Sequence, residues 1–491
     1  MIRSRLFPTL AAVLVLTSGC GTASYNAVTG ESTRGAYTWA QEVQIGQQSD
    51  QQIIAQYGLY DDPALQAYVE QMGQTVLQTS AYSDPTTPAE IRSTPFYFRL
   101  LDSPVVNAFA LPGGYIYITR GLLSYLENEA QLAVVMGHEI GHVLARHSSR
   151  QALKQQRGQF LLLGGAVAGG VVGGGDVAQG ILEVGSQGAQ LLFLSYGRDA
   201  ERESDRAGVA YAEFAGYDAA EAARFFRALD RLSTQSGGGL PSFLSTHPDP
   251  SEREQTIPQL AAQYDTGTEV NTDAYLARIE DIVIGENPRQ GFVENNTFYH
   301  PELRFEFAVP RGWQVQNSAA AVLMAEPQGR AAVQFTFAQA ESAAAAYQKL
   351  AQMQGVTVQG SDRTTIGGYP AVVAEGTAAQ QNGAVGFAVT YIEYGGNVYE
   401  FLGLTNAQTY GTYRQTLRGV AGSFERLTNS SMLNRQPTRL EIVTLRNAAT
   451  LRSLLGNRTL PAGLTADEVA IMNEVQLDDR LPSGTRVKLP G

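Results

Sequence analysis

The sequence predicts an α+β protein that is mainly helical in its first half and contains an antiparallel sheet in its second half. Apolar residues recur at helical spacing through much of residues 39–285, whereas residues 298–428 contain stretches that alternate between apolar and polar side chains, as strands do. A chain of 491 residues is long enough for about two to four domains with cores of their own. The prediction is therefore a chain of several units, taken in order below.

The first 20 residues are predicted to be a secretory signal. A basic start leads into an apolar stretch, Leu10 to Leu16, which is followed by Thr17-Ser18-Gly19-Cys20. This segment resembles a bacterial lipoprotein signal, in which the cysteine becomes the lipidated first residue, and by the same resemblance Gly21 favours the outer membrane. Thr17 departs from the usual leucine, and an ordinary cleaved signal is the alternative. Because Cys20 is the only cysteine, no disulfide can form within the chain.

The net charge and the segments that follow describe an acidic, mainly helical unit. Asp and Glu number 47 against 35 Lys and Arg, which argues against a nucleic-acid surface. Residues 21–38 are polar and predicted to be a tether, and residues 39–285 are predicted to be one domain. Within it the patterns predict helices, a strand over 95–102, a hairpin over 105–119, and a helix over 129–150 that is capped by Asn128.

The most informative motif is His138-Glu139-Ile140-Gly141-His142, which has the pattern H-E-x-x-H. Residues four apart share one face of a helix, so His138 and His142 can bind one zinc ion while Glu139 handles a proton. Hydrolytic zinc sites use three protein ligands and keep one position for water. The alternative is a pair of ordinary surface histidines on a helix.

The third ligand is expected on a second helix, in the sequence from Tyr196 to Asp205. Glu201 and Asp205 are four residues apart and share a face, whereas Glu203 is rotated away from them. We predict that Glu201 binds zinc and that Asp205 accepts a hydrogen bond from a ligand imidazole. A charged helix in solvent is the alternative, and the upstream H-E-x-x-H motif favours the metal site.

Three segments together resemble the CAAX-prenyl-protease and HtpX type of zinc metallopeptidase: residues 98–123, 138–142 and 195–205. The resemblance covers about residues 35–260 and implies a gluzincin-type catalytic domain. In it His138, His142 and Glu201 are zinc ligands, Glu139 is the general acid and base, and Asp205 is the supporting carboxylate. The sequence is most similar to periplasmic lipoprotein members that assist outer-membrane β-barrel assembly, but it lacks the tetratricopeptide repeats that those often carry.

His247 lies in Thr246-His247-Pro248-Asp249-Pro250, which resembles the His-Pro segment of the periplasmic relatives. Two functional interpretations are open: a hydrogen bond to the oxyanion of the reaction, or a fourth ligand that keeps the enzyme inactive until it is displaced. The third interpretation is a loop histidine without a role in the site. We hypothesise that His247 is the regulatory fourth ligand. His147, five residues after His142, is predicted to lie off the metal face as a helix-end cation, like Arg150.

Asn107, Ala108, Phe109 and Ala110 form a predicted edge strand. By resemblance to gluzincins, this strand pairs with the extended backbone of a substrate. An internal strand is the alternative. The substrates expected from the first interpretation are unfolded or extended segments of proteins or peptides.

The later segments contain no obvious catalytic or metal-binding motif. Residues 298–428 are predicted to be an α+β domain of unknown role, with a hairpin over Gly395-Gly396-Asn397. Residues 438–491 resemble a LysM module, but Ala448-Ala449 replaces its usual Gly-Asp, so binding to peptidoglycan stays open. The Gly-rich segment 158–190 is predicted to be a helical hairpin, either simply packed or gating the site.

The leading prediction is a zinc endopeptidase, with one Zn²⁺ per chain, that cleaves misfolded or misassembled proteins of the bacterial cell envelope. It is expected to be lipid-anchored at the outer membrane and to face the periplasm, with the outer-membrane assembly machinery as a potential partner and no nucleic-acid partner. The alternatives are a chaperone-like assembly factor with a latent metal site and a cell-wall-binding lipoprotein. An unchanged cellular phenotype after Glu139→Gln has removed the peptidase activity would favour the chaperone-like factor. Binding of residues 438–491 to peptidoglycan would favour the cell-wall-binding lipoprotein.

Overall fold

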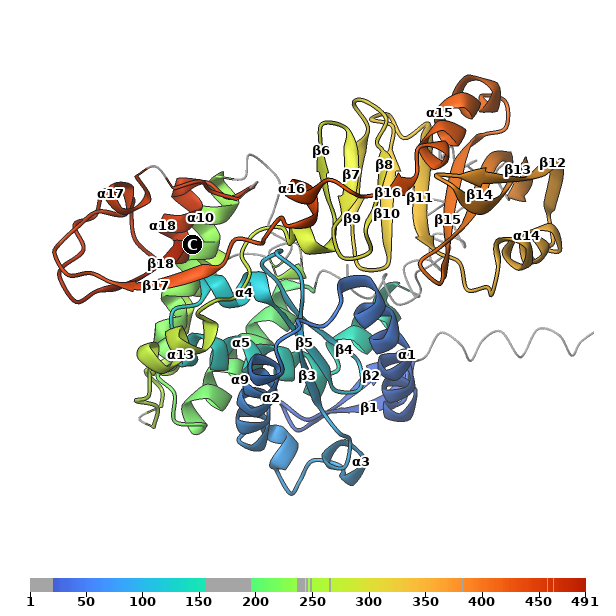
Figure 1. Ribbon diagram of the computed structural model, residues 1–491. Coiled ribbons are helices and arrows are strands. Elements are labelled where there is room, and N and C mark those ends of the chain that lie inside the picture. The colour runs from blue at the N-terminus through green and yellow to red at the C-terminus, as the bar shows by residue number, and fades with distance from the viewer. Residues whose placement is uncertain are drawn as a thin grey trace, which may run out of the picture.

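The computed structural model describes residues 21–155, 196–235, 243, 246–247, 250–264, 266–380, 383–456, 458–461 and 463–491 (Figure 1). Helices and mainly antiparallel sheets are both present, which confirms the predicted α+β class. Among these residues, no helix combines the length and the apolar character that a membrane crossing needs. Cys20 and the whole Gly-rich segment 158–190 lie outside the described residues, and the predicted domain boundaries stay predictions.

The first group, residues 21–284, surrounds a three-stranded sheet of order β3-β5-β4. The strands of this sheet are β3 (Tyr97–Leu101), β4 (Ala108–Leu111) and β5 (Tyr115–Thr119). Its helices are α1 (Trp39–Tyr57), α2 (Pro63–Gln78), α3 (Ala89–Arg92), α4 (Arg120–Tyr125), α5 (Glu129–Leu144), α9 (Arg198–Phe214), α10 (Ala222–Gln235), α12 (Pro250–Ala261) and α13 (Thr272–Ile279). Strand β4 pairs with β5 as the predicted hairpin, and within this sheet it is an edge strand.

Helix α5 carries the H-E-x-x-H motif and is buried from Ala130 to Leu144. Its N-terminal cap is the predicted one, because the Asn128 side chain accepts a hydrogen bond from the backbone N–H of Gln131 at 2.9 Å. The helix ends at Leu144, earlier than the predicted end at residue 150. Arg146 stops it by adopting a left-handed backbone with φ 59°, while its guanidinium bonds to Glu42. A second helical stretch, residues 147–155, follows this break.

Helices α5 and α9 approach each other closely because glycines face each other across the contact. A Cβ atom on Gly208 would lie 2.8 Å from the backbone N of His138, and one on Gly137 would lie 2.9 Å from the carbonyl O of Gly208. Any larger residue at either position would push the helices apart. The glycines therefore bring the carboxylates of α9 within reach of the histidines of α5.

The predicted tether, residues 21–38, is instead an antiparallel hairpin of β1 (Thr22–Asn26) and β2 (Glu31–Gly35). It packs on the first group, since Ala27 is buried in the core and its N–H donates to the carbonyl O of Leu144 at 3.1 Å. The segment has the polar composition of a linker, so its strands were not predicted, although one face of the hairpin contacts the domain. The hairpin thus reaches the end of the helix that carries His138 and His142.

The second group, residues 292–426, consists of two antiparallel sheets with helices α14 (Ala343–Ala351) and α15 (Tyr410–Gly422). The seven-stranded sheet has the order β12-β13-β14-β15-β11-β10-β9 and the four-stranded sheet has the order β16-β8-β7-β6. The strands are β6 (Phe292–Glu294), β7 (Thr297–His300), β8 (Phe305–Ala308), β9 (Gln314–Asn317), β10 (Ala321–Ala325), β11 (Ala331–Phe337), β12 (Val356–Ile366), β13 (Tyr369–Gln380), β14 (Gly383–Tyr394), β15 (Asn397–Asn406) and β16 (Glu425–Arg426). Both residues of the turn between β14 and β15, Gly395 and Gly396, have positive φ, as a two-residue hairpin turn requires.

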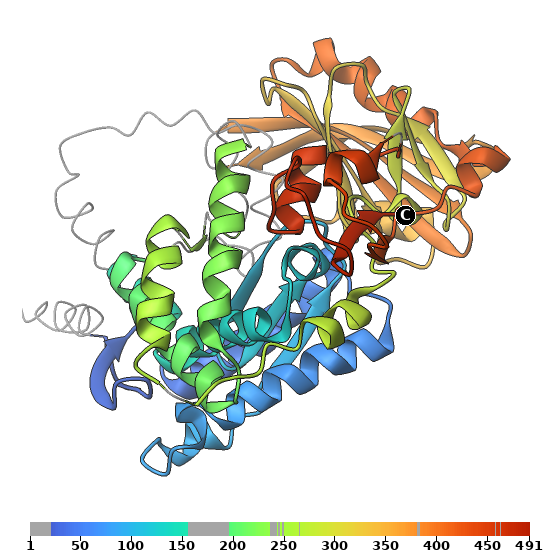
Figure 2. The same cartoon turned by 90° about the vertical axis from the view of Figure 1, so that its left-hand side faces the viewer.

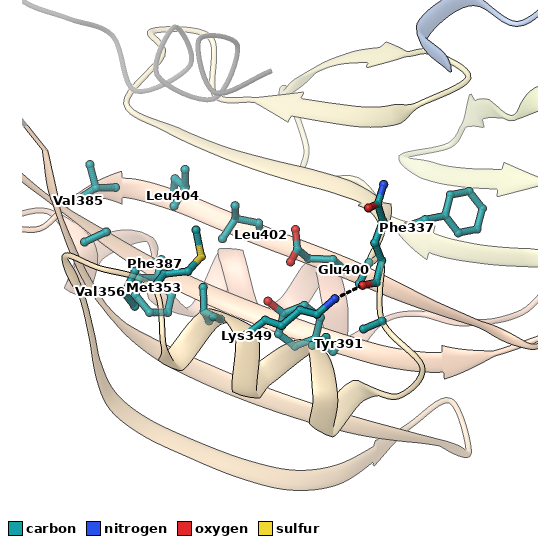
Figure 3. A pocket seen from close by; sticks show the side chains of 16 residues that line it. Phe337, Lys349, Met353, Val356, Val385, Phe387, Tyr391, Glu400, Leu402 and Leu404 are labelled. Carbon is teal, nitrogen blue, oxygen red and sulfur yellow. Dashed lines mark hydrogen bonds between the residues drawn. The ribbon is translucent and has the colours of Figure 1, made fainter. Parts of the chain in front are cut away.

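A cavity of about 480 Å³ lies between α14 and the seven-stranded sheet (Figure 3). Leu402, Leu404 and Val385 give one end an apolar lining, and Glu400 and Lys349 lie toward the other end (Figure 3). All of its lining residues belong to the second group. The cavity is therefore not part of the histidine-rich site described below.

The third group, residues 430–490, packs against the first (Figures 1 and 2). It contains α16 (Ser430–Leu433), α17 (Leu451–Leu455), α18 (Ala466–Met472) and the antiparallel pair β17 (Leu440–Thr444) and β18 (Arg486–Pro490). Lys488 is only 1% exposed, and its ammonium donates to the carbonyl O of Ser124 at 3.0 Å and of Leu126 at 2.8 Å. It also pairs with Glu127 at 3.0 Å, so β18 supports the chain just before α5 begins.

Candidate metal centre

Four buried side chains gather where α5, α9 and the segment around His247 meet. One ligand atom from each of His138, His142, Glu201 and His247 lies within 4.8 Å of every other. The Nε2 atoms of His138 and His142 are 2.9 Å apart, and the Glu201 carboxylate lies 3.4 Å from the second of them. Imidazole nitrogens together with a carboxylate are the ligands that zinc takes in proteins without available thiolates.

Glu139 lies beside this cluster and shows that the site fits a metal ion and its water. Both of its carboxylate oxygens are buried and have no hydrogen-bond partner among the described residues. Burial raises the pKa of Glu139 to about 7, although the nearby His247 acts in the opposite direction. A buried carboxyl without a partner is costly unless the protein binds something that satisfies it. The donor set and this carboxyl therefore fit a bound zinc ion.

The two histidines of the motif are prepared to act as neutral ligands. Burial lowers the pKa of His138 to about 4 and the pKa of His142 well below its ordinary value. Because their Nε2 atoms face the cluster, a metal ion bound there would leave the proton of each ring on Nδ1. The Nδ1 of His138 lies 2.9 Å from Asp205, and its N–H would then donate to that carboxylate, which is the contact predicted for Asp205.

Arg253, on α12, completes this side of the site, and sequence reasoning assigned it no role. Its guanidinium hydrogen-bonds to Asp205 and lies 4.1 Å above the ring centroid of Phe226. Burial works against the ionised form of Asp205, but Arg253 and His138 hold its pKa at about 2. The signal that could have found Arg253 is the need of two buried carboxylates for a compensating cation.

The prediction that His147 is a helix-end cation is wrong. His147 is 2% exposed, its Nδ1 lies 2.9 Å from the Nδ1 of His142, and burial lowers its pKa. The prediction assumed one continuous helix. The break at Arg146 instead redirects the chain and brings the ring of His147 back to the ring of His142. On another side of His142, the ring of Tyr196 stacks with centroids 4.2 Å apart.

His247 lies inside the cluster, as the His-Pro resemblance implied. Its Nδ1 is 3.2 Å from both carboxylate oxygens of Glu201, and its Nε2 is 3.4 Å from Glu139. Burial lowers its pKa, but the carboxylates of Glu201 and Glu139 together outweigh that effect, so the pKa lies above its ordinary value. The segment lies close to the predicted substrate strand, because the N–H of Phe243 donates to the carbonyl O of Val106 at 3.2 Å.

Of the predicted substrate strand, Ala108, Phe109 and Ala110 belong to β4, and Asn107 immediately precedes it. Helix α5 packs beside β4. The backbone N–H of Asn107 donates to the Thr119 hydroxyl at 3.1 Å, which fixes the start of the strand against β5.

A buried H-E-x-x-H helix, joined by a glutamate from a second helix, defines the zinc-metallopeptidase class of domain. Comparison with known proteins gives a family match: residues 63–261 match the model described as Peptidase family M48. This confirms the predicted type of metallopeptidase and its zinc cofactor.

Curated proteins are also similar to part of the chain. The beta-barrel assembly-enhancing protease of Escherichia coli (strain K12) is 30% identical over 228 residues, which are 46% of this chain and 44% of that protein. The mitochondrial metalloendopeptidase OMA1 of Arabidopsis thaliana is 32% identical over 162 residues, 33% of this chain and 30% of that protein. The chain thus spans less than half the length of these relatives.

Proposed function

We propose that this protein is a zinc-dependent endopeptidase that hydrolyses peptide bonds in misfolded or misassembled proteins of the bacterial cell envelope. The observation that carries the proposal is the buried cluster of His138, His142 and Glu201, with the carboxyl of Glu139 beside it, which has no hydrogen-bond partner among the described residues. Similarity to a protease named for β-barrel assembly supports the envelope as its place of action. We further propose that Cys20 is the lipidated residue that anchors the chain at the outer membrane.

Each residue of the site has a separate role in the proposed reaction. His138, His142 and Glu201 would hold the zinc ion, and Asp205 fixes the ring of His138 through its Nδ1–H. Zinc bound there would polarise the scissile carbonyl and acidify a water molecule. Glu139 accepts the proton of the attacking water and delivers it to the leaving amine, and its raised pKa suits both transfers near neutral pH.

The substrate is proposed to bind as an extended backbone along the free edge of β4. Edge strands present unpaired N–H and C=O groups that accept an additional strand. Pairing of this kind uses hydrogen bonds to the backbone of the substrate rather than contacts with its side chains, so unfolded segments of many sequences can bind. Most of the backbone of a folded protein is already paired within its own secondary structure, which favours unfolded segments as substrates.

Removal and restoration of zinc test the proposed function. The purified full chain is treated with a chelator, and cleavage of unfolded casein is measured before treatment, after it, and after zinc is restored. We expect activity to fall to background with the metal and to return with it, because polarisation and water activation both need the ion. Activity that persists in chain shown to be free of metal would contradict the proposal.

His247 is proposed to be a displaceable fourth ligand that keeps the site inactive, since its Nδ1 lies 3.2 Å from Glu201 and 3.2 Å from the Nε2 of His138. If the open form is a minor state, His247→Ala should raise casein cleavage by roughly tenfold or more. Zinc content and cleavage are measured together. A fall in activity at full zinc content would assign His247 to the oxyanion instead, and no change in either would reject both roles.

A further inference from the structure

The histidine ligands differ in how their outer ring nitrogens are held. His138 contacts a carboxylate directly, through its Nδ1–H and Asp205 at 2.9 Å. The Nδ1 of His142 meets another imidazole, that of His147, at 2.9 Å. The second nitrogen of His147, Nε2, lies 3.2 Å from the carboxylate of Glu203.

The proton positions along this path follow from the ligand role of His142. Its Nε2 lies in the cluster and would bind the metal, so its proton would be on Nδ1 and would be donated to the Nδ1 of His147. His147 accepts there and must therefore carry its own proton on Nε2, which it donates to Glu203. Every donor meets an acceptor, and the path ends on a carboxylate.

The N-terminal hairpin holds the far end of this path. The side-chain oxygen of Asn26 accepts from the N–H of Val28 at 2.9 Å, which directs its NH₂ group toward Glu203, to which it donates. Arg150 donates to the same carboxylate at 3.1 Å. The carboxylate of Glu203 is thus fixed from three directions, by His147, Arg150 and β1.

We propose that His147 and Glu203 are positioning residues that fix the proton and the orientation of the His142 ring, and that Asn26 links the N-terminal hairpin to zinc binding. This inference rests on the proposed zinc site. Without an acceptor, the buried Nδ1–H of His142 would be unpaired, and the ring would turn or change its proton position. Zinc affinity, rather than folding alone, should therefore depend on residues that touch neither metal nor substrate.

The test measures the zinc dissociation constant of the full chain by competition with a chromophoric chelator. We expect His147→Phe and Glu203→Ala to weaken zinc binding by roughly 10- to 100-fold, the usual effect of losing a residue that supports a ligand. His147→Gln retains an acceptor and a donor and should recover most of the affinity. Asn26→Ala should weaken binding by a smaller factor, because Arg150 still holds Glu203.

Glu213→Gln is the matched control. Glu213 lies on the same helix and is 3% exposed, and it accepts hydrogen bonds from the N–H groups of Ala219 and Gly267, away from the cluster. It should lower thermal stability without changing the zinc dissociation constant. Cobalt(II) absorption spectra of the same variants report ligand geometry independently of affinity.

The outcomes separate this inference from the proposed function. If wild type binds zinc and the His147 and Glu203 variants bind it equally well with unchanged cobalt spectra, the positioning role is wrong. It is also wrong if Glu213→Gln weakens zinc binding as much as they do, because general destabilisation would then explain the loss. If wild type itself binds no zinc, the proposed function fails, whatever the variants do.

Discussion

Replacement of Glu139 by Gln should lower the rate of casein cleavage by roughly 10²- to 10⁴-fold, the usual contribution of a general acid and base. Gln has the shape of Glu, but its amide cannot take a proton from water or return one to the leaving amine. Glu139 is outside the set of four ligand-bearing residues, so the variant should retain its zinc. Cleavage rate and metal content are measured on the same preparation.

Glu474→Gln provides the control for this experiment. Glu474 is a second buried carboxyl, and burial raises its pKa to about 7 as well, but its partners are Arg224 and Gln131 rather than the cluster. The control should cleave casein as wild type does. A Glu139→Gln protein that still cleaves at the wild-type rate would eliminate the proposed mechanism, and an unchanged cellular phenotype with cleavage lost would favour the chaperone-like alternative.

Replacement of Glu201 by Gln should weaken zinc binding by roughly 100-fold or more and abolish cleavage at low zinc concentration. This magnitude follows if the ~10–16 kcal/mol typical of a four-ligand zinc site is divided among its ligands. The neutral amide also removes the charge that holds His247 in the cluster, at 3.2 Å from both oxygens. Zinc affinity and the rise in melting temperature on zinc addition are the measurements.

Glu252→Gln serves as the comparison, because Glu252 pairs with Arg202 at 2.8 Å on the surface of the molecule and should leave zinc affinity unaltered. Equal zinc affinity in the Glu201→Gln and wild-type proteins would remove Glu201 from the ligand set. In that case His138, His142 and His247 would be the three remaining candidates.

The parts of the site that were predictable are those set by local helical geometry. The spacing of four places His138 with His142 and Glu201 with Asp205, whatever the rest of the fold does. The motif alone does not show how the two helices meet. That depends on the contact between Gly137 and Gly208, where a single added carbon would meet backbone atoms.

The parts that were missed depend on the backbone and on distant elements. One residue with positive φ, Arg146, redirects the chain and turns His147 from an expected surface cation into a buried partner of His142. Arg253 reaches the site from a helix whose own sequence gives no reason to predict it. The hairpin over residues 22–35 was missed because its composition is that of a linker.

The contact of Lys488 with the chain before α5 has a consequence in time. Lys488 follows Ser124, whose carbonyl it binds, by 364 residues. Contacts between residues so far apart in the sequence form late in folding, because closing the long segment between them costs chain entropy before the contact stabilises anything. Helix α5 can therefore form with its neighbours in the first group before Lys488 of β18 reaches the carbonyls of Ser124 and Leu126.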